Sequence, residues 1–366
     1  MMLACCGVGN AASADKTEAP AAREPVRVIF DTDMGNDIDD ALALAIIHAL
    51  QSRHECRLLA VTLSKDNAYA APFVDLVNTF YGRGNIPVGR VTNGKTLEIG
   101  KYLKPVVEAK NVDDKPLYPH RIQPDSATDS GRLRIRYAVS STADSMAVEA
   151  VALLRRTLAA QPDGSVAMVM VGFSTNLARL LDSAPDTASP LPGRELVAKK
   201  VTLLSMMAGH FTGNGPRNVG EYNLVKDVPA AQKVVKDWPT PLVMSPWELG
   251  DAIKYPAVSI ERDYGYVAHH PVAEAYRLYM KFPYARPTWD LTSVLYAVRP
   301  DRGYFGLSEP GTITVTDTAI TGFAPSPQGH HRILTASPEQ GTRTLEAMVC
   351  LCSQPPDEPK PKETKP

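Results

Sequence analysis

Residues 28–44 read VIFDTDMGNDIDDALAL, a short apolar run that leads into a cluster of acidic residues and then into an apolar helical pattern. The acidic residues are Asp31, Asp33, Asp37, Asp39 and Asp40. A carboxylate at a helix N-terminus gains about 0.3–1 kcal/mol from the helix dipole, which is too little to offset so many close like charges. A bound cation is the simplest explanation, and oxygen ligands of this kind favour a hard ion, Ca²⁺ or Mg²⁺.

Apolar strand-like runs alternate with helical patterns along the chain. The expected strands cover residues 26–30, 56–63, 165–172, 201–209 and 240–246, and the expected helices cover 39–50, 70–82, 145–160, 175–183 and 229–238. This alternation predicts an α/β fold with an open, mostly parallel central sheet, helices on both faces and a Rossmann-like core. Ligands of such sheets bind beyond the carboxyl ends of the strands, where the aspartates are expected. Residues 310–335 predict β-hairpin-like material, followed by a helix.

The composition is typical of a soluble globular protein. The chain has 366 residues, of which 44% are hydrophobic and 22% are charged, and its formal net charge is -1. This charge argues against a broad surface for nucleic acid or acidic membranes. No run of about 20 apolar residues predicts a membrane span. We expect one domain over residues 25–352.

The two ends of the chain differ from the body in composition. Residues 1–24 predict a leader or flexible segment, and MLAC at 2–5 resembles the end of a lipoprotein signal with Cys5 or Cys6 as the lipidated residue. An exported protein, periplasmic or lipid-anchored, and a cytoplasmic protein with a disordered leader both remain open. Residues 353–366 are charged and rich in proline, which predicts a disordered tail.

Three other interpretations explain the acidic stretch less well. A phosphatase of the haloacid-dehalogenase type would use Asp31 and Asp33 in a DxDxT or DxDxV signature, but Gly35 occupies the Thr/Val position. An EF-hand fails because Asn36 and Leu42 stand where the loop needs Gly and Glu. A simple capped helix does not explain acidic residues that precede the helix and follow a buried strand.

A fourth interpretation comes from the resemblance of this stretch to the signature of a known family. DTDMGNDIDDALAL resembles the DxDxGxDDxxAL signature of the inosine–uridine-preferring nucleoside hydrolase family, with Asp37 and Ile38 as an apparent insertion before the double Asp. Further segments resemble the family's motifs in the family's order: GFSTNLARLL (172–181) its GPLTNIALAL, MMAGHF (206–211) its MGG turn, EYNLVKDVPAAQKV (221–234) its AEFNxxxDPEAAxxV, and TWDLTSVLYAV (288–298) its HDPLAVAYAL.

The resemblance implies a nucleoside hydrolase-like fold and a Ca²⁺-dependent hydrolysis of ribonucleosides to ribose and free base. It implies that Asp33 ligates the metal and serves as general base, that Asp40 and Asp290 are further carboxylate ligands, and that Thr175 binds through its main-chain carbonyl. The ribose-binding residues that it implies are Asp39, Asn67, Met207, Asn214, Glu221 and Asn223.

The residue that would protonate the departing base is not evident. Purine-preferring members commonly carry a His just before the late aspartate, whereas this chain has Trp289, which can stack on a base but is no useful acid. His210, Tyr222 and Tyr284 are candidate replacements. The natural base, purine or pyrimidine, stays open, as does a non-catalytic relative that binds a ribosyl ligand with the same metal. Asp37 is expected to be a solvated loop charge. Relatives are usually dimers or tetramers, so a homo-oligomer is expected.

Overall fold

The computed structural model describes residues 24–124, 136–137, 148–211 and 220–357. The strands are β1 Val26–Thr32, β2 Cys56–Leu63, β3 Val88–Arg90, β4 Ile122–Gln123, β5 Arg136–Tyr137, β6 Val148–Glu149, β7 Val166–Met170, β8 Val201–Met207, β9 Leu242–Ser245, β10 Lys254–Tyr255, β11 Arg286–Pro287, β12 Gly306–Leu307, β13 Gly311–Val315, β14 Thr321–Pro325 and β15 His331–Thr335. The helices are α1 Asp39–Ser52, α2 Ala70–Phe80, α3 Leu103–Val107, α4 Ala150–Ala159, α5 Thr175–Asp182, α6 Gly193–Lys200, α7 Tyr222–Lys226, α8 Val228–Asp237, α9 Trp247–Ala252, α10 Ala257–Arg262, α11 Pro271–Tyr279, α12 Trp289–Val298 and α13 Pro338–Cys352.

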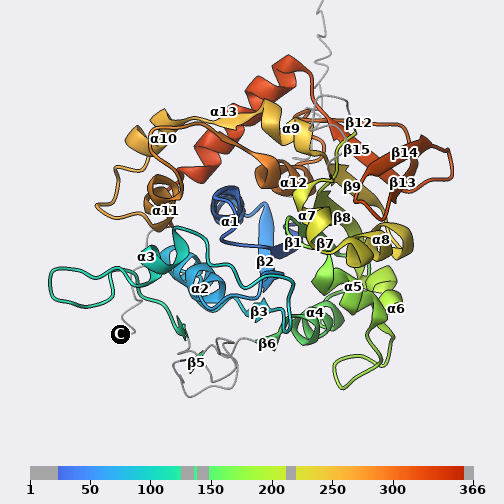
Figure 1. Ribbon diagram of the computed structural model, residues 1–366, viewed down its shortest axis with the longest axis horizontal. Coiled ribbons are helices and arrows are strands. Elements are labelled where there is room, and N and C mark those ends of the chain that lie inside the picture. The colour runs from blue at the N-terminus through green and yellow to red at the C-terminus, as the bar shows by residue number, and fades with distance from the viewer. Residues whose placement is uncertain (1–23, 125–135, 138–147, 212–219, 358–366) are drawn as a thin grey trace, which may run out of the picture.

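The main sheet is open and mixed. Its strand order is β14-β13-β15-β9-β8-β7-β1-β2-β3-β6, and β12 pairs with β15. Every neighbouring pair from β15 to β6 is parallel, whereas β12, β13 and β14 add an antiparallel edge. The expected α/β class with a mostly parallel sheet is therefore confirmed, and so is the late hairpin (Figure 1).

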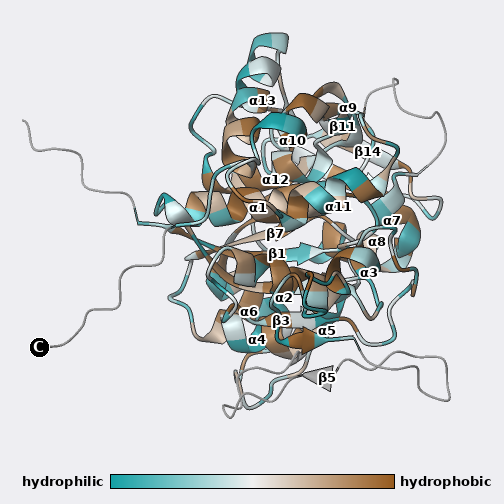
Figure 2. Ribbon diagram, turned by 90° about the vertical axis from the view of Figure 1, so that its left-hand side faces the viewer, coloured by the Kyte–Doolittle hydropathy of each residue, from teal (hydrophilic) through white to brown (hydrophobic). Residues whose placement is uncertain are grey.

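The central strand β1 is apolar on both faces because helices cover both. Val28 and Phe30 belong to the hydrophobic cluster that also contains α1 and α12, whereas Ile29 belongs to the cluster of α4, α5, α6 and α8. Alternate residues of a strand point to opposite faces, which explains this division. Figure 2 shows α1 and α12 on one side of β1 and β7, and α4 and α5 on the other.

The strand order also places a crevice. The chain leaves β1 for β2 on one side and later returns to β7 on the other side. At such a switch point the loops beyond the carboxyl ends of the strands diverge and leave room for a ligand. The acidic stretch follows β1 directly and therefore lies at this point.

Several boundaries differ from the sequence-based expectation. The helix expected over 145–160 begins at Ala150, because Val148 and Glu149 pair with β3 and the Glu149 side chain caps α4 by accepting from the Ala152 N–H at 2.9 Å; residues 145–147 lie outside the described part. The sequence did not predict β3, which has only three residues, or α6, which is largely polar.

The ends of the chain are only partly described. The expected leader, apart from Glu24, lies outside the described residues. At the start of the expected tail, Gln354 accepts a hydrogen bond from Arg53 at 2.6 Å, and Asp357 accepts from Ser52 at 2.9 Å. These contacts hold residues 354–357 against the end of α1. Within the described residues, no helix is both long enough and apolar enough to cross a membrane.

Candidate active site

The loop between β1 and α1 carries the acidic stretch and is tied at both ends. The Thr32 hydroxyl donates a hydrogen bond to the Asp40 carboxylate and accepts one from the Met34 N–H at 3.1 Å. Gly35 adopts a φ of 104°, and a Cβ there would lie 2.3 Å from a methyl carbon of Leu103. Only glycine fits this turn without strain. The loop thus holds the carboxylates before and after the turn in fixed positions.

Asp31 lies beneath the site and not in it. Its carboxylate accepts hydrogen bonds from the Thr62 hydroxyl at 2.6 Å and from the Asn176 amide at 2.8 Å. Burial raises the pKa of Asp31 to about 7. The side chain is fully buried and does not line the cavity described below. A phosphatase nucleophile must reach its substrate, so this position argues against the phosphatase interpretation.

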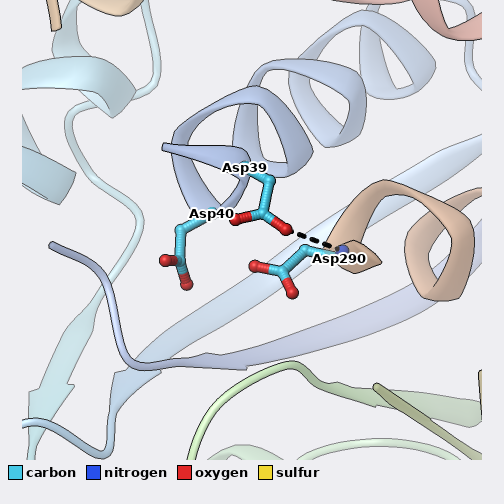
Figure 3. A group of neighbouring side chains, drawn as sticks. All are labelled: Asp39, Asp40 and Asp290. Carbon is cyan, nitrogen blue, oxygen red and sulfur yellow. Dashed lines mark hydrogen bonds between the residues drawn. The ribbon is translucent and has the colours of Figure 1, made fainter. Parts of the chain in front are cut away.

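Three carboxylates from opposite ends of the chain converge (Figure 3). Asp39 and Asp40 open α1, and Asp290 lies in the first turn of α12. One oxygen from each lies within 4.8 Å of the other two, so the three could hold a metal ion. The Asp290 backbone N–H donates to Asp39 at 3.2 Å, which fixes the two helix starts relative to each other.

Asp33 lies in the same cavity but outside this group of three. It is 3% exposed, and its Oδ2 atom has no hydrogen-bond partner among the described residues. The sequence assigned Asp33, Asp40 and Asp290 to the metal and Asp39 to the sugar, whereas the geometry brings Asp39 into the close group. Asp33 is near enough for the charge of Asp40 to raise its pKa, after the larger effect of burial.

The carboxylates destabilise one another's charged forms. Burial has an even larger effect in the same direction. Together, with burial as the largest cause, these effects raise the pKa of Asp39 to about 7 and that of Asp40 to about 8. The pKa of Asp290 is raised by burial and by the charges of Asp39 and Asp40. The positive charge of Lys65 lowers the pKa of Asp33 and of Asp40 and so opposes these effects. Its buried ammonium has no hydrogen-bond partner in the described part of the chain and lies 3.9 Å from a Glu98 oxygen.

A cavity of about 250 Å³ opens over these carboxylates. Of the residues that the sequence singled out, it is lined by Asp33, Asp37, Asp39, Asp40, Met207, Glu221, Tyr222, Asn223, Trp289 and Asp290. Segments far apart in the chain therefore meet at one place. The predicted Asn214 lies outside the described residues.

Glu221 and Asn223 form one wall of the cavity. The Glu221 carboxylate caps α7 by accepting from the Asn223 N–H at 2.9 Å, and burial raises its pKa to about 7. The Asn223 amide donates to the backbone oxygens of Val171 at 3.0 Å and of Met207 at 3.3 Å. These contacts fix the Asn223 side chain at the ends of β7 and β8.

Four of the described candidate residues do not line the cavity with their side chains. One is Tyr284, whose hydroxyl donates to the Tyr276 carbonyl at 2.5 Å. The Thr175 hydroxyl donates to Asp227 at 2.6 Å. Asn67 accepts from the Tyr69 and Ala70 N–H groups at 3.0 and 2.9 Å, just before and at the start of α2. His210 packs its ring with the centroid 5.2 Å from that of Trp247, and burial lowers its pKa, which favours the neutral ring over the protonated form that could donate a proton.

The cavity is also lined by aromatic residues and by a cation that the sequence did not single out. Trp247, Tyr279, Trp289 and Arg286 line it. Arg286 pairs with Asp37, which is 8% exposed. The expectation that Asp37 is a solvated loop charge is therefore wrong, because a buried guanidinium neutralises it. No sequence motif surrounds Arg286 or Tyr279.

The raised pKa values predict an unusual pH dependence of stability for protein stripped of metal. Asp31, Asp39, Asp40 and Glu221 retain protons in the folded state that an unfolded chain would release near pH 4. Their contribution to stability is therefore lost as the pH rises from about 4 to about 8. In the presence of a metal chelator, the melting temperature of the protein should fall between pH 5 and pH 8. Added Ca²⁺ should restore the melting temperature at pH 8. A chelator-treated sample whose melting temperature rises over this range would contradict the description of the site.

Comparisons with known proteins agree with this geometry. A family model described as inosine-uridine preferring nucleoside hydrolase matches residues 28–345. A solved plant nucleoside hydrolase is 19% identical, with a TM-score of 0.61 over 90% of this chain and 100% of its own. An inosine-uridine preferring nucleoside hydrolase from Bacillus anthracis is 15% identical, with a TM-score of 0.62 over 90% of this chain and 99% of its own.

A third solved structure is described as an effector and not as a hydrolase. It is a type III effector protein, XopQ, complexed with adenosine diphosphate ribose, and it is 15% identical, with a TM-score of 0.58 over 91% of this chain and 95% of its own. Identities this low show a shared fold alone. No curated protein sequence matches the chain.

Proposed function

The chain belongs to the inosine-uridine preferring nucleoside hydrolase family, and on that premise we propose that it hydrolyses the N-glycosidic bond of ribonucleosides with the help of a Ca²⁺ ion. The membership confirms the resemblance carried by the sequence motifs. One observation supports the proposal above the others. Carboxylates from the start and the end of the chain converge in a cavity that Glu221 and Asn223 also line.

The residues present fit a hard divalent ion. Asp33 Oδ2 and Asp40 Oδ2 are buried and without a hydrogen-bond partner in the described part of the chain, and such orphaned oxygens are costly unless something positive binds them. Asp40 and Asp290 would hold the ion together with Asp33 or Asp39, and the Thr175 carbonyl is a further proposed ligand. When bound, the ion would acidify a water molecule and orient it with the ribose hydroxyls.

The side chains divide the remaining work. Asp33 would remove the proton from the attacking water, since its free Oδ2 atom faces no competing donor among the described residues. Asp39, Met207 and Asn223 would hold the ribose. Glu221 would stabilise the positive charge that develops on the sugar ring as the bond to the base breaks.

A second candidate function is a metal-dependent binder of a ribosyl ligand without turnover. The feature that favours it is Trp289, which stands where a proton donor would be expected and whose indole Nε1–H already donates to the Trp247 carbonyl at 2.8 Å. The effector structure with adenosine diphosphate ribose shows that a protein of this fold was solved with a ribosyl compound.

A nucleoside panel separates the two functions. We expect purified protein in Ca²⁺ to release reducing sugar from at least one of inosine, guanosine, adenosine, uridine and cytidine. Chelator should stop the release and Ca²⁺ should restore it, and p-nitrophenyl phosphate should not be cleaved. Calcium-dependent thermal stabilisation by nucleosides without any sugar release would instead support the binder.

A further inference from the structure

Arg286 brings a positive charge into the same cavity as the aspartates. It lies in β11, where its backbone pairs with Tyr255 of β10, and its side chain is 17% exposed. The guanidinium carbon lies 4.9 Å from the centroid of the Trp289 ring and 5.0 Å from that of Tyr279. Two aromatic faces thus hold the cation in place, which suits a guanidinium.

Asp37 holds the guanidinium from a third side. Arg286 Nε donates to Asp37 Oδ1 at 2.7 Å, and Nη2 pairs with Asp37 Oδ2. Asp37 is itself anchored, because the Tyr102 hydroxyl donates to its backbone oxygen at 2.6 Å. Asp37 and Ile38 form the insertion that separates this chain from the family signature. Arg286 therefore pairs with one of the two residues of this insertion.

The pairing leaves one terminal nitrogen available. Nε and Nη2 point to Asp37, and within the described residues Nη1 forms no hydrogen bond with the protein. Burial lowers the pKa of Arg286 to about 10, so the group stays charged at neutral pH. It can donate a hydrogen bond but cannot usefully give up a proton.

The arrangement of the cavity gives Arg286 its place in the reaction. Arg286, Tyr279 and Trp289 line the same cavity as the carboxylates, Glu221 and Asn223 that are assigned to the metal and the sugar, so a base attached to that sugar would come within reach of the guanidinium. We propose that Arg286 stabilises the departing base, with Nη1 donating to an acceptor atom of that base as negative charge develops on it. This inference rests on the proposed hydrolysis, and it requires a base that can leave as an anion with a carbonyl oxygen or ring nitrogen facing the guanidinium.

The step balances without a proton donor at the base. The electron pair of the C–N bond goes to the base nitrogen, and the base leaves as an anion. The water oxygen bonds to the sugar carbon, and its proton goes to Asp33. Solvent protonates the base after release, and Asp33 returns its proton to solvent, so nucleoside and water give ribose and neutral base.

The test compares two leaving groups in the holoenzyme with Ca²⁺. Arg286→Gln removes the positive charge. Arg286→Lys keeps the charge but lacks the planar set of N–H donors of the guanidinium. On the nucleoside that the wild-type protein cleaves best, Arg286→Gln should lower kcat by roughly 10²–10³-fold, as removal of a charge-stabilising donor does. On p-nitrophenyl riboside, whose leaving group is already a stable anion, the loss should stay under roughly tenfold, because little stabilisation is needed. Arg286→Lys should lie between these on the nucleoside.

Arg277→Gln is the matched control. Arg277 also lies against an aromatic ring, 5.8 Å from the centroid of Phe282, and donates to the Ile260 carbonyl at 2.7 Å, but it does not line the cavity. Its loss should change the two substrates equally. The melting temperature in Ca²⁺ shows whether each variant is folded.

The outcomes are distinguishable. Equal losses on both substrates for Arg286→Gln, or no loss on the nucleoside, would show that Arg286 only anchors the insertion and would overturn the inference while the proposed function stands. A wild-type protein that cleaves neither compound would overturn the proposed function and the inference with it.

Discussion

Asp33→Asn is expected to lower kcat for nucleoside hydrolysis by roughly 10²–10⁴-fold at saturating Ca²⁺, the range for a lost general base. The amide is close in shape to the carboxylate but cannot accept the proton of the attacking water. KM should change much less than kcat, since Glu221 and Asn223, the proposed sugar contacts, are intact. Steady-state kinetics on the nucleoside that the wild-type protein cleaves best measure both constants.

Asp31→Asn is the matched control for this variant. Asp31 is two residues away and also fully buried, but it binds Thr62 and Asn176 and does not line the cavity. The change should alter the melting temperature and leave kcat within about tenfold of the wild-type value, an effect well below that of a lost general base. The phosphatase interpretation predicts the reverse, because Asp31 would then be the nucleophile. If Asp31→Asn lost activity and Asp33→Asn kept it, our assignment would be wrong.

The second large effect is expected for Asp290→Asn. This change removes one of the three carboxylates within 4.8 Å of one another. A bound metal supplies several kcal/mol of transition-state stabilisation, so kcat/KM should fall by on the order of 10²–10³-fold or more at about 1.4 kcal/mol per factor of ten. Stabilisation of the fold by Ca²⁺ should be lost as well.

The same variant should be more stable than the wild-type protein in chelator. Asp39, Asp40 and Asp33 all raise the pKa of Asp290, and removing its charge relieves that repulsion. At pH 8 in chelator the melting temperature of Asp290→Asn should therefore exceed that of the wild-type protein, and the order should reverse in Ca²⁺. Asp75→Asn serves as control, since Asp75 is buried but binds Arg121 at 3.2 Å, away from the cavity. It should lower stability in both conditions. An Asp290→Asn protein that Ca²⁺ still stabilises as strongly as the wild type would refute the assignment of Asp290 to the metal.

Much of the site could be predicted because each of its motifs lies where a strand ends or a helix begins, and both leave a local pattern in the sequence. Asp33, Asp39 and Asp40 follow a buried strand and open a helix, and Glu221 and Asp290 each mark the start of a helix. Once a parallel sheet is expected, strand ends and the helices after them meet at one edge. Spacing alone could not assign Asp39 to the group of three, because that depends on how closely α12 approaches α1.

The aromatic and cationic side of the cavity could not be predicted in this way. Trp247, Tyr279 and Arg286 come from the short elements α9, α11 and β11, and none lies in a recognisable motif. Their side chains reach the cavity through packing between late segments and the loop that carries Asp37, with Arg286 and Asp37 separated by 249 residues. No local pattern encodes such a contact. The Thr175 and Asn67 side chains bind Asp227 and the backbone at the start of α2, and the sequence did not predict either contact.

The central claim is that a single divalent ion is held by carboxylates from the start and the end of the chain. A crystal structure of the protein grown with Ca²⁺ tests it most directly, through the anomalous signal of the ion. We expect one strong peak in the cavity, at about 2.3–2.6 Å from oxygens of Asp40 and Asp290, the usual range for calcium. A peak at another place, or a cavity without one at saturating Ca²⁺, would contradict the account.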